Sequence, residues 1–337
     1  MTSPDPSSIL DLIQAFRRSK VMFTAVSLGI FDKLQSNPAN AAELATSLQC
    51  NPDALERLLD SCIALGFLSR SDGKYTNTEI SSAYLVSNSP NTLAGYVMHS
   101  DLSLYPLWAN LEDAVREGTN RWEQTFGSGK GLFDHFFRNE ESRRSFLNGM
   151  HGFGCLSSPS VVRAFDLGFF RRVADLGGAT GHLLIAACEA YPHLTGVVFD
   201  LPAVKPFAEE HIAASPAAGR IQFLSGDFFK DDLPPADLYF LARIVHDWSE
   251  EKIALLLRRI FAALPSGGGL LIAESLLDED HSGPLPALMQ HLNMLICTEG
   301  KERSCSEYKL LLESVGFRSV ECRRTGTFLD AVLARKP

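Results

Sequence analysis

The pattern of apolar and polar residues changes near residue 170. Beyond that point, short apolar runs alternate with amphipathic segments whose apolar positions recur at helical spacing. The runs predict strands at 172–176, 196–199, 221–224, 237–241 and 269–274, and a terminal pair near 317–324 and 327–334. The segments between them predict helices near 180–190, 202–213, 249–263, 285–297 and 304–315. This order is typical of an α/β fold, with helices on both faces of a mostly parallel sheet that has an antiparallel terminal strand.

The first hundred residues predict helices and one hairpin. Apolar spacing indicates two helices within 8–36, and Asn40 and Glu43 stand at the spacing of a capping box. Another helix begins at Asn51, and residues 67–78 alternate around an Asp-Gly turn, which indicates a hairpin. Helices followed by a hairpin, in this order, are typical of a winged-helix domain.

Residues 79–167 are predicted to be mostly helical, with one helix at 108–116 and another near 140–152. Aromatic residues are dense in this part of the chain. We expect most of them to fill the core and a few to line the pocket of an aromatic ligand.

Charge and composition exclude several classes of protein. The 337 residues carry a net charge of −9, whereas a nucleic-acid-binding surface needs an excess of Lys and Arg. The winged-helix region is itself slightly acidic, which favours a dimerisation role over DNA binding, and its segment 21–34 is apolar on nearly all sides. A DNA-binding regulator, the alternative, would need a basic recognition helix.

Three further features predict a cytoplasmic location. No apolar run approaches the ~18 residues that span a bilayer, and the polar, acidic N-terminus is unlike a signal peptide. The seven cysteines are scattered and lack C-x-x-C spacing, so we expect reduced thiols.

A glycine-rich turn follows the first strand of the α/β part. It reads D-x-G-x-A-x-G, with Asp175 at its start, Ala179 in the middle and Gly181 at its end. Glycines let a ligand approach the backbone, and Asp200, which ends the next strand, can accept hydrogen bonds from both hydroxyls of a ribose. The spacing differs from G-x-G-x-x-G of dinucleotide-binding proteins. The alternative is a tight turn that binds no ligand.

Two later segments also follow predicted strands. Asp227 and Phe228 are suited to bind an adenine through its amino group and its face, or they form an ordinary turn. His246 titrates near neutrality and is a candidate general base, whereas a lone histidine is otherwise a structural residue.

Two glutamates are candidates to orient that histidine. Either Glu274 or Glu302 can hold the second imidazole nitrogen and fix its tautomer, or both are solvated surface charges. We predict no metal site, because His281 and His291 lack acids at ligand spacing.

Several motifs together resemble one family. ADLGGATG, VVFDLP, GDFFKDDLP, LARIVHDWSEEK, GGGLLIAESLLDED, LNMLICTEGKERS and TGTFLDAVLARK are similar to motifs of class I S-adenosylmethionine (SAM)-dependent small-molecule O-methyltransferases. DAVREGTNRWEQTFG and AFDLGFF resemble the hydroxyindole branch of this family. The resemblance runs from about residue 10 to the C-terminus.

The resemblance implies three parts and a homodimer. They are a winged-helix dimerisation domain at 1–100, a helical linker at 101–165 that contributes to the substrate pocket, and a Rossmann-like SAM-methyltransferase domain at 166–337. It implies SAM as the methyl donor and S-adenosylhomocysteine (SAH) as the product, whereas the absence of a metal, nucleic-acid or membrane partner is predicted from ligand spacing, charge and hydropathy.

Residue by residue, the resemblance implies three groups of site residues. His246 is the expected general base, with the acids Asp247, Glu274 and Glu302 beside it. The expected cofactor-binding residues are Gly177, Asp200, Gly226, Asp227, Phe228, Arg243 and Phe137. The expected substrate-binding residues are Asn293, Cys297, Phe146, Met150 and Phe153.

The chain departs from the branch at four positions. Ala179 replaces the middle glycine of the turn, which is tolerable if its φ is negative. Phe137 and Gly154 align with a tyrosine and a tryptophan, and Cys297, a weak hydrogen-bonding residue, aligns with a substrate-facing glutamine. A hydroxyindole such as N-acetylserotonin is the first expected substrate. The alternatives are another phenolic or polyketide-type substrate, or a SAM-binding relative without catalysis.

Overall fold

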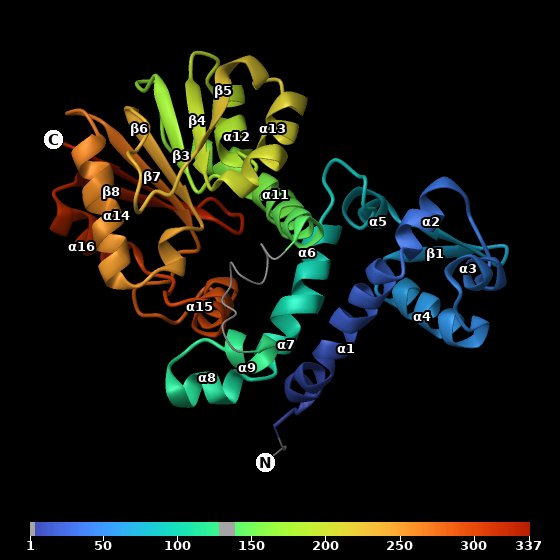
Figure 1. The fold of residues 1–337 in the computed structure, drawn as a ribbon. Coiled ribbons are helices and arrows are strands. Elements are labelled where there is room, and N and C mark those ends of the chain that lie inside the picture. The colour runs from blue at the N-terminus through green and yellow to red at the C-terminus, as the bar shows by residue number, and fades with distance from the viewer. Residues whose placement is uncertain (1–3, 128–138) are drawn as a thin grey trace. The chain divides into compact units, whose positions relative to one another are not determined.

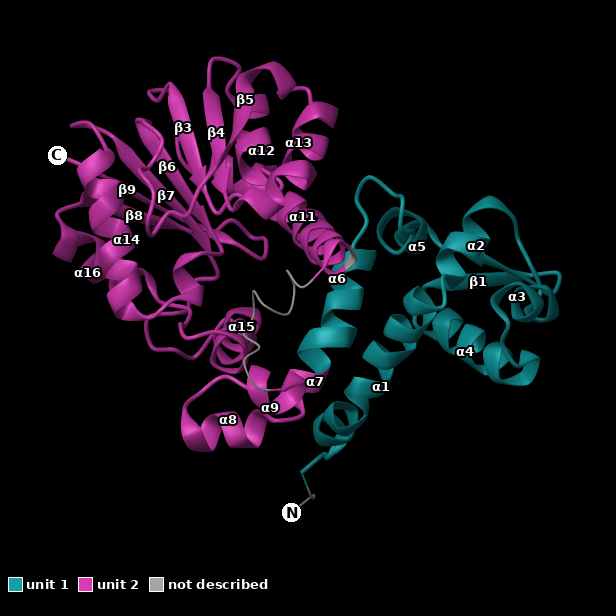
Figure 2. Cartoon of the chain, viewed as in Figure 1, with its two compact units in different colours: residues 1–105 teal, residues 106–337 magenta. Residues whose placement is uncertain are grey.

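The computed structural model describes residues 4–127 and 139–337. The chain forms two compact units, residues 1–105 and 106–337 (Figure 2). Among the described helices, none is long and apolar enough to cross a membrane. The finer division expected at residues 100 and 165 stays a prediction.

The first unit is mainly helical, with one hairpin. Its elements are α1 (Ser7–Ser27), α2 (Ile30–Ser36), α3 (Ala41–Leu48), α4 (Pro52–Ala64), β1 (Leu68–Ser71), β2 (Lys74–Asn77), α5 (Glu79–Tyr84), α6 (Ala94–His99) and the π-helix η1 (Ser100–Leu104) (Figure 1). The capping box is confirmed, because the side chain of Asn40 accepts from the Glu43 N–H and the Glu43 side chain accepts from the Asn40 N–H. The hairpin is confirmed as well, with β1 antiparallel to β2.

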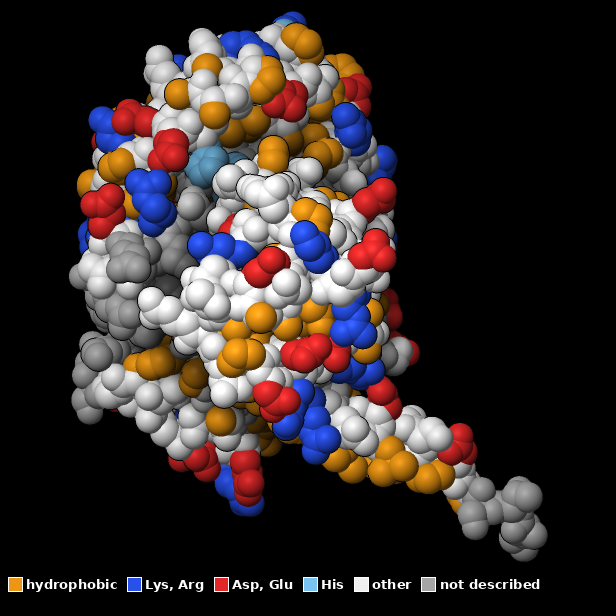
Figure 3. Space-filling view, turned by 90° about the vertical axis from the view of Figure 1, so that its right-hand side faces the viewer, with side chains coloured by type: hydrophobic (Ala, Val, Ile, Leu, Met, Phe, Trp, Pro, Cys, Tyr) orange, Lys and Arg blue, Asp and Glu red, His pale blue; other side chains and the backbone are white. Residues whose placement is uncertain are grey.

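One face of α1 exposes large apolar side chains. Phe31, Leu59 and Tyr75 lie in the core of the unit and are at most 1% exposed. On α1, in contrast, Leu12 is 75% exposed. Ile9, Leu10, Ile13 and Phe16 are exposed with it. Figure 3 shows apolar side chains gathered along the segment that leads to the N-terminus. We call this set of five residues the α1 stripe.

The second unit begins with helices and continues as an α/β domain. Its elements are α7 (Tyr105–Trp108, at the boundary of the two units), α8 (Leu111–Glu117), α9 (Trp122–Phe126), α11 (Glu140–Arg163), β3 (Arg172–Leu176), α12 (His182–Ala190), β4 (Thr195–Asp200), η2 (Pro202–Val204), α13 (Lys205–Ala214), η3 (Ala218–Arg220), β5 (Ile221–Ser225), β6 (Leu238–Ala242), η4 (Val245–Asp247), α14 (Glu250–Ala263), β7 (Gly269–Glu274), α15 (Leu285–Cys297), α16 (Cys305–Val315), β8 (Arg318–Arg323) and β9 (Asp330–Arg335).

The seven-stranded sheet confirms the predicted fold class. Its strand order is β5-β4-β3-β6-β7-β9-β8; the first five strands are parallel, and β9 is antiparallel to both of its neighbours. The order reverses between β3 and β6, which is where open α/β sheets bind ligands.

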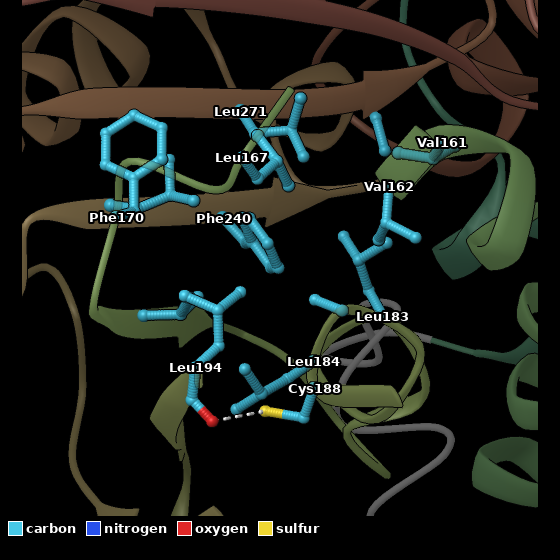
Figure 4. Close-up of a cluster of buried hydrophobic side chains, with 14 of the residues drawn as sticks. Val161, Val162, Leu167, Phe170, Leu183, Leu184, Cys188, Leu194, Phe240 and Leu271 are labelled. Atoms are coloured by element: carbon cyan, nitrogen blue, oxygen red, sulfur yellow. Dashed lines mark hydrogen bonds between the residues drawn. The ribbon is translucent and has the colours of Figure 1, made fainter. Parts of the chain in front are cut away.

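Helices cover both faces of the sheet (Figure 1). On one face, Leu184 and Phe240 belong to a cluster that joins the sheet to α11, α12 and α13 (Figure 4). On the other face, Leu257 and Tyr308 bring α14 and α16 against the sheet. Burial of each such leucine contributes roughly 1.5–3 kcal/mol, so these two layers fix the strand ends that carry the site.

The extent of one helix differs from the sequence prediction. Helix α11 extends to Arg163, well beyond the predicted end at residue 152, and contains Pro159. The helix continues because its last turns bury Val161 and Val162 in the core, which outweighs the hydrogen bond that a proline cannot donate.

The prediction that all cysteines are reduced is wrong for two of them. Cys305 and Cys322 form a disulfide with their Cα atoms 6.0 Å apart, and the other five cysteines are free. Cys305 begins α16 and Cys322 lies in β8, so the packing of this helix beside this strand brings the thiols together. Sequence spacing gives no sign of this contact.

Reduction of this disulfide is expected to lower the free energy of unfolding by roughly 3 kcal/mol, because the unfolded chain regains the freedom of a short loop. Urea unfolding with and without a thiol reductant measures the difference. Cys305→Ser/Cys322→Ser should be insensitive to the reductant, and Cys50→Ser, which changes a free thiol, should respond as the native chain does. Titration of all seven thiols in unreduced, denatured protein would contradict the disulfide.

Candidate active site

The carboxyl ends of the parallel strands bring the predicted site residues together. Gly177 directly follows β3, Asp200 ends β4, Arg243 follows β6 and Glu274 ends β7. Parallel strands end at the same edge of a sheet, so residues that are far apart in sequence share one rim.

The glycine-rich turn is tied to this rim by Asp200. Its Oδ2 accepts the N–H of Ala179 at 2.9 Å and its Oδ1 accepts the N–H of Leu201 at 2.7 Å. Gly177 has φ +67°, and a Cβ at this position would lie 2.5 Å from Ile244 Cδ1. A side chain at this position would therefore be strained and would displace the side chain of Ile244.

Ala179 does not meet the condition expected of it. Its φ is +48° rather than negative. The backbone therefore lies in the left-handed region, which costs a residue with a Cβ about 1–2 kcal/mol. The hydrogen bond from its N–H to Asp200 holds the turn in this conformation.

Of the two acids at the start of the rim, Asp175 is buried and Asp200 is half-buried. Burial raises the pKa of Asp175 to about 7, with a further contribution from the charge of Asp200. Burial also raises the pKa of Asp200 to about 6, against the hydrogen bonds it accepts from the backbone. A ligand that donates hydrogen bonds to Asp200 would stabilise its charged form.

Asp227 stabilises the turn after β5. Its Oδ1 accepts the N–H of Phe229 at 2.9 Å and its Oδ2 lies 2.8 Å from Lys230 Nζ. These contacts outweigh partial burial and lower the pKa of Asp227. A Cβ on Gly226 would lie 2.2 Å from the ring of Phe199, so the turn must pass close to β4. Phe228 packs against Phe229 with ring centroids 4.7 Å apart.

Arg243 turns the chain sharply after β6. Its φ is +58°, which is uncommon for a residue with a side chain. Its guanidinium carbon lies 5.0 Å from the ring centroid of Phe153. Its Nη1 is buried and has no hydrogen-bond partner among the described residues, which suits an anionic ligand group.

The imidazole of His246 is buried against two carboxylates. His246 lies in η4 and is 3% exposed. Its Nδ1 is 2.6 Å from Glu302 Oε1 in hydrogen-bonding geometry and 2.8 Å from Glu274 Oε2. Glu274 Oε1 instead accepts the backbone N–H of Val245 at 2.9 Å, so Glu302 orients the ring and Glu274 anchors the backbone.

The neighbouring acids make His246 strongly basic. Burial opposes a charged imidazole, but the carboxylates, above all Glu274 and Glu302, outweigh it and hold the pKa of His246 well above its ordinary value. Asp247 Oδ1 lies 3.6 Å from Nε2, the nitrogen that neither glutamate contacts. Burial also raises the pKa of Asp247 to about 6.

His246, Glu274 and Glu302 also carry atoms of the kinds that bind metal ions. One such nitrogen or carboxylate oxygen from each of His246, Glu274 and Glu302 lies within 4.8 Å of the others. Several of these atoms already take part in the hydrogen bonds within the group and to the backbone, which accounts for their close approach.

Asn293 is held by two neighbours. Its Oδ1 accepts the Nε1–H of Trp108 at 2.9 Å and lies 3.6 Å from the Cys297 sulfur. Burial raises the pKa of the Cys297 thiol to about 12, so this thiol is neutral and is directed toward Asn293. The amide nitrogen of Asn293 is the end that remains for a ligand.

The predicted pocket-wall residues fall on one helix. Phe146, Met150 and Phe153 lie on α11 and are half-buried. Phe146 packs near Ala179, and Phe153 packs on Phe328 with ring centroids 5.0 Å apart. Phe137, the remaining cofactor candidate, lies outside the described residues.

Sequence reasoning missed a polar group between α11 and α12. His182 Nδ1 lies 2.8 Å from Ser158 Oγ, and His151 Nδ1 lies 2.8 Å from Thr180 Oγ1. Thr180 belongs to the glycine-rich turn, so its contact with His151 ties the turn to α11. The only sequence signal was a histidine directly after the last glycine of the turn.

The fold and the rim define a methyltransferase-type α/β domain, and the chain belongs to the O-methyltransferase family. An O-methyltransferase domain matches residues 108–318 and an O-methyltransferase dimerisation domain matches residues 10–87. Acetylserotonin O-methyltransferase of Bos taurus is 43% identical, over 98% of this chain and 97% of its own length. The Gallus gallus enzyme is 44% identical, with coverage of 98% and 97%. The crystal structure of human N-acetylserotonin methyltransferase in complex with SAM has a TM-score of 0.93 at 40% identity, covering 100% of this chain and 99% of that chain.

Replacement of Glu302 by Gln is expected to lower the pKa of His246. The variant removes one of the negative charges that stabilise the imidazolium, so the pKa should fall by about one to three pH units. Titration of the His246 ring by NMR measures the effect. Glu321→Gln, at an exposed position in β8, is the control and should leave the pKa unchanged. An unchanged pKa in Glu302→Gln would show that Glu302 does not act on this ring.

Proposed function

We propose that the protein transfers a methyl group from SAM to a phenolic hydroxyl of a small aromatic molecule, first of all a hydroxyindole of the N-acetylserotonin type. The observation that carries the proposal is the buried His246, whose Nδ1 is held by Glu302 beside the rim of Asp200 and Gly177. The relatives named acetylserotonin O-methyltransferase support the same reaction and substrate class.

The rim residues fit a SAM molecule. Asp200 offers carboxylate oxygens to the ribose hydroxyls, Gly177 leaves room for close approach, and the unpartnered Nη1 of Arg243 suits a carboxylate. Phe228 supplies an apolar face for the adenine. When bound, SAM supplies an electrophilic methyl group on a sulfonium.

His246 would remove the proton from the hydroxyl group of the methyl acceptor. The Nδ1–H donates to Glu302, so in the neutral ring Nε2 carries the lone pair that accepts the phenolic proton. The adjacent carboxylates stabilise the imidazolium that forms. Because the reactive form is neutral and the pKa is raised, the rate should increase with pH through that pKa.

The acceptor pocket differs from that expected for N-acetylserotonin at Cys297. Its thiol is buried against Asn293, so it is a poor replacement for an amide that binds substrate. This position is the observation that favours the second candidate, another phenolic or polyketide-type acceptor.

We also propose a homodimer formed through residues 10–87. The α1 stripe supports it, because an exposed row of large apolar residues is typical of a subunit contact. A cytoplasmic location, and the lack of a nucleic-acid partner, stay predictions.

His246→Ala is expected to reduce methyl transfer by about 10²- to 10⁴-fold, the usual contribution of a general base, while SAH still binds. Mass spectrometry of phenols and hydroxyindoles incubated with SAM measures turnover, and calorimetry measures SAH binding. His281→Ala, which changes an exposed histidine, is the matched control. Full activity in His246→Ala would contradict the role of His246, and SAH binding without turnover of any phenol by the native chain would favour a non-catalytic relative.

Leu12→Glu is expected to yield a monomer, because it places a charge in the apolar α1 stripe. Sedimentation or light scattering measures the mass. Leu310→Glu is the matched control, since Leu310 is 70% exposed on α16, outside the dimerisation domain. A native chain that is monomeric would contradict the proposed dimer, and a dimeric Leu12→Glu would exclude the α1 stripe as its contact.

A further inference from the structure

The first residue of α12 carries an imidazole with a defined hydrogen-bonding state. His182 is half-buried and directly follows Gly181, the last glycine of the turn. Its Nδ1 lies 2.8 Å from Ser158 Oγ, and Ser158 Oγ donates to the carbonyl of Gly154 at 2.9 Å. A hydroxyl has one hydrogen, so Ser158 must accept from His182 Nδ1–H.

This arrangement fixes the tautomer of His182. Burial, and next the charge of Arg243, lower the pKa of His182 to about 4, so the ring is neutral near pH 7. With the hydrogen on Nδ1, the Nε2 atom carries a free lone pair and can only accept. Among the described residues, none makes a hydrogen bond to this Nε2.

Gly154 makes room for the ring. A Cβ at Gly154 would lie 2.4 Å from Nε2, 2.5 Å from Cε1 and 2.7 Å from Cδ2 of His182. These three distances are nearly equal, so a face of the ring, and not its edge, lies over Gly154. The lone pair of Nε2, which lies in the ring plane, is therefore not directed at Gly154.

The guanidinium of Arg243, which has a hydrogen-bond donor without a partner among the described residues, lies near His182. Arg243 is close enough to affect the pKa of His182, and its guanidinium packs over Phe153, the residue before Gly154. The Nη1 of Arg243 has no hydrogen-bond partner within the described part of the chain. A hydrogen-bond acceptor beside a cation complements a zwitterion, which carries an ammonium donor and a carboxylate.

We propose that His182 is a cofactor-binding residue whose Nε2 accepts a hydrogen bond from the α-ammonium group of SAM, while Arg243 faces its carboxylate. This inference rests on the proposed function and assigns the amino-acid end of the donor to these two side chains. Ser158 and Gly154 are positioning residues, because one fixes the tautomer and the other provides the space.

The test compares two ligands by calorimetry: SAH, and the SAH analogue that lacks only the amino group. His182→Ala should weaken SAH binding about 10- to 100-fold, the value of a hydrogen bond to a charged group, and leave binding of the analogue unchanged. Ser158→Ala frees the tautomer and should weaken SAH binding less, again without affecting the analogue. His193→Ala, at an exposed position three residues after the end of α12, is the matched control and should alter neither affinity.

The outcomes separate this inference from the proposed function. Failure of the native chain to bind SAH would overturn the proposed function itself. If the native chain binds SAH and His182→Ala weakens the binding of both ligands equally, His182 packs against the ligand without a hydrogen bond to its ammonium group. If His182→Ala weakens neither, His182 does not contact the ligand. If His182→Ala does not fold by circular dichroism, Ser158→Ala decides through the same comparison of the two ligands.

Discussion

One imidazole held away from water against two carboxylates determines the arrangement of the rim. His246, Glu274 and Glu302 are each at most 3% exposed. Removal of one partner from a buried charged pair typically costs 3–5 kcal/mol, because the other charge is left without compensation. Since Glu274 also accepts the backbone N–H of Val245, the same group fixes the chain that follows β6. Ring orientation, basicity and backbone path therefore depend on one set of contacts.

Most of the fold was predictable because apolar periodicity records burial directly. The bounds predicted for β7 and α15 agree with the structure to the residue. The start of the last strand was placed three residues too early, because the hydroxyls of Thr325 and Thr327 donate to the carbonyl of Leu329 and hold a turn there. Such local polar bonds do not alter the apolar pattern, so the pattern continues through the turn.

The site was predictable only where strand order sets position. Residues after β3, β4, β6 and β7 had to meet, whatever their side chains did. Which glutamate binds Nδ1, and whether Ala179 has positive φ, depend on distances of a few tenths of an ångström and on the turn geometry. The roles of the site residues stay predictions, while His182 was missed because its partner Ser158 lies on a different helix.

The close fit of His182 over Gly154 constrains how this pair can evolve. Replacement of Gly154 by any larger residue forces the imidazole of His182 to move, and loss of the imidazole leaves an empty volume beside Gly154. We therefore expect substitutions at residues 154 and 182 to be coupled. A homologue with a bulky side chain in place of Gly154 should carry a small residue in place of His182, so that a side chain from one helix or the other fills the same space.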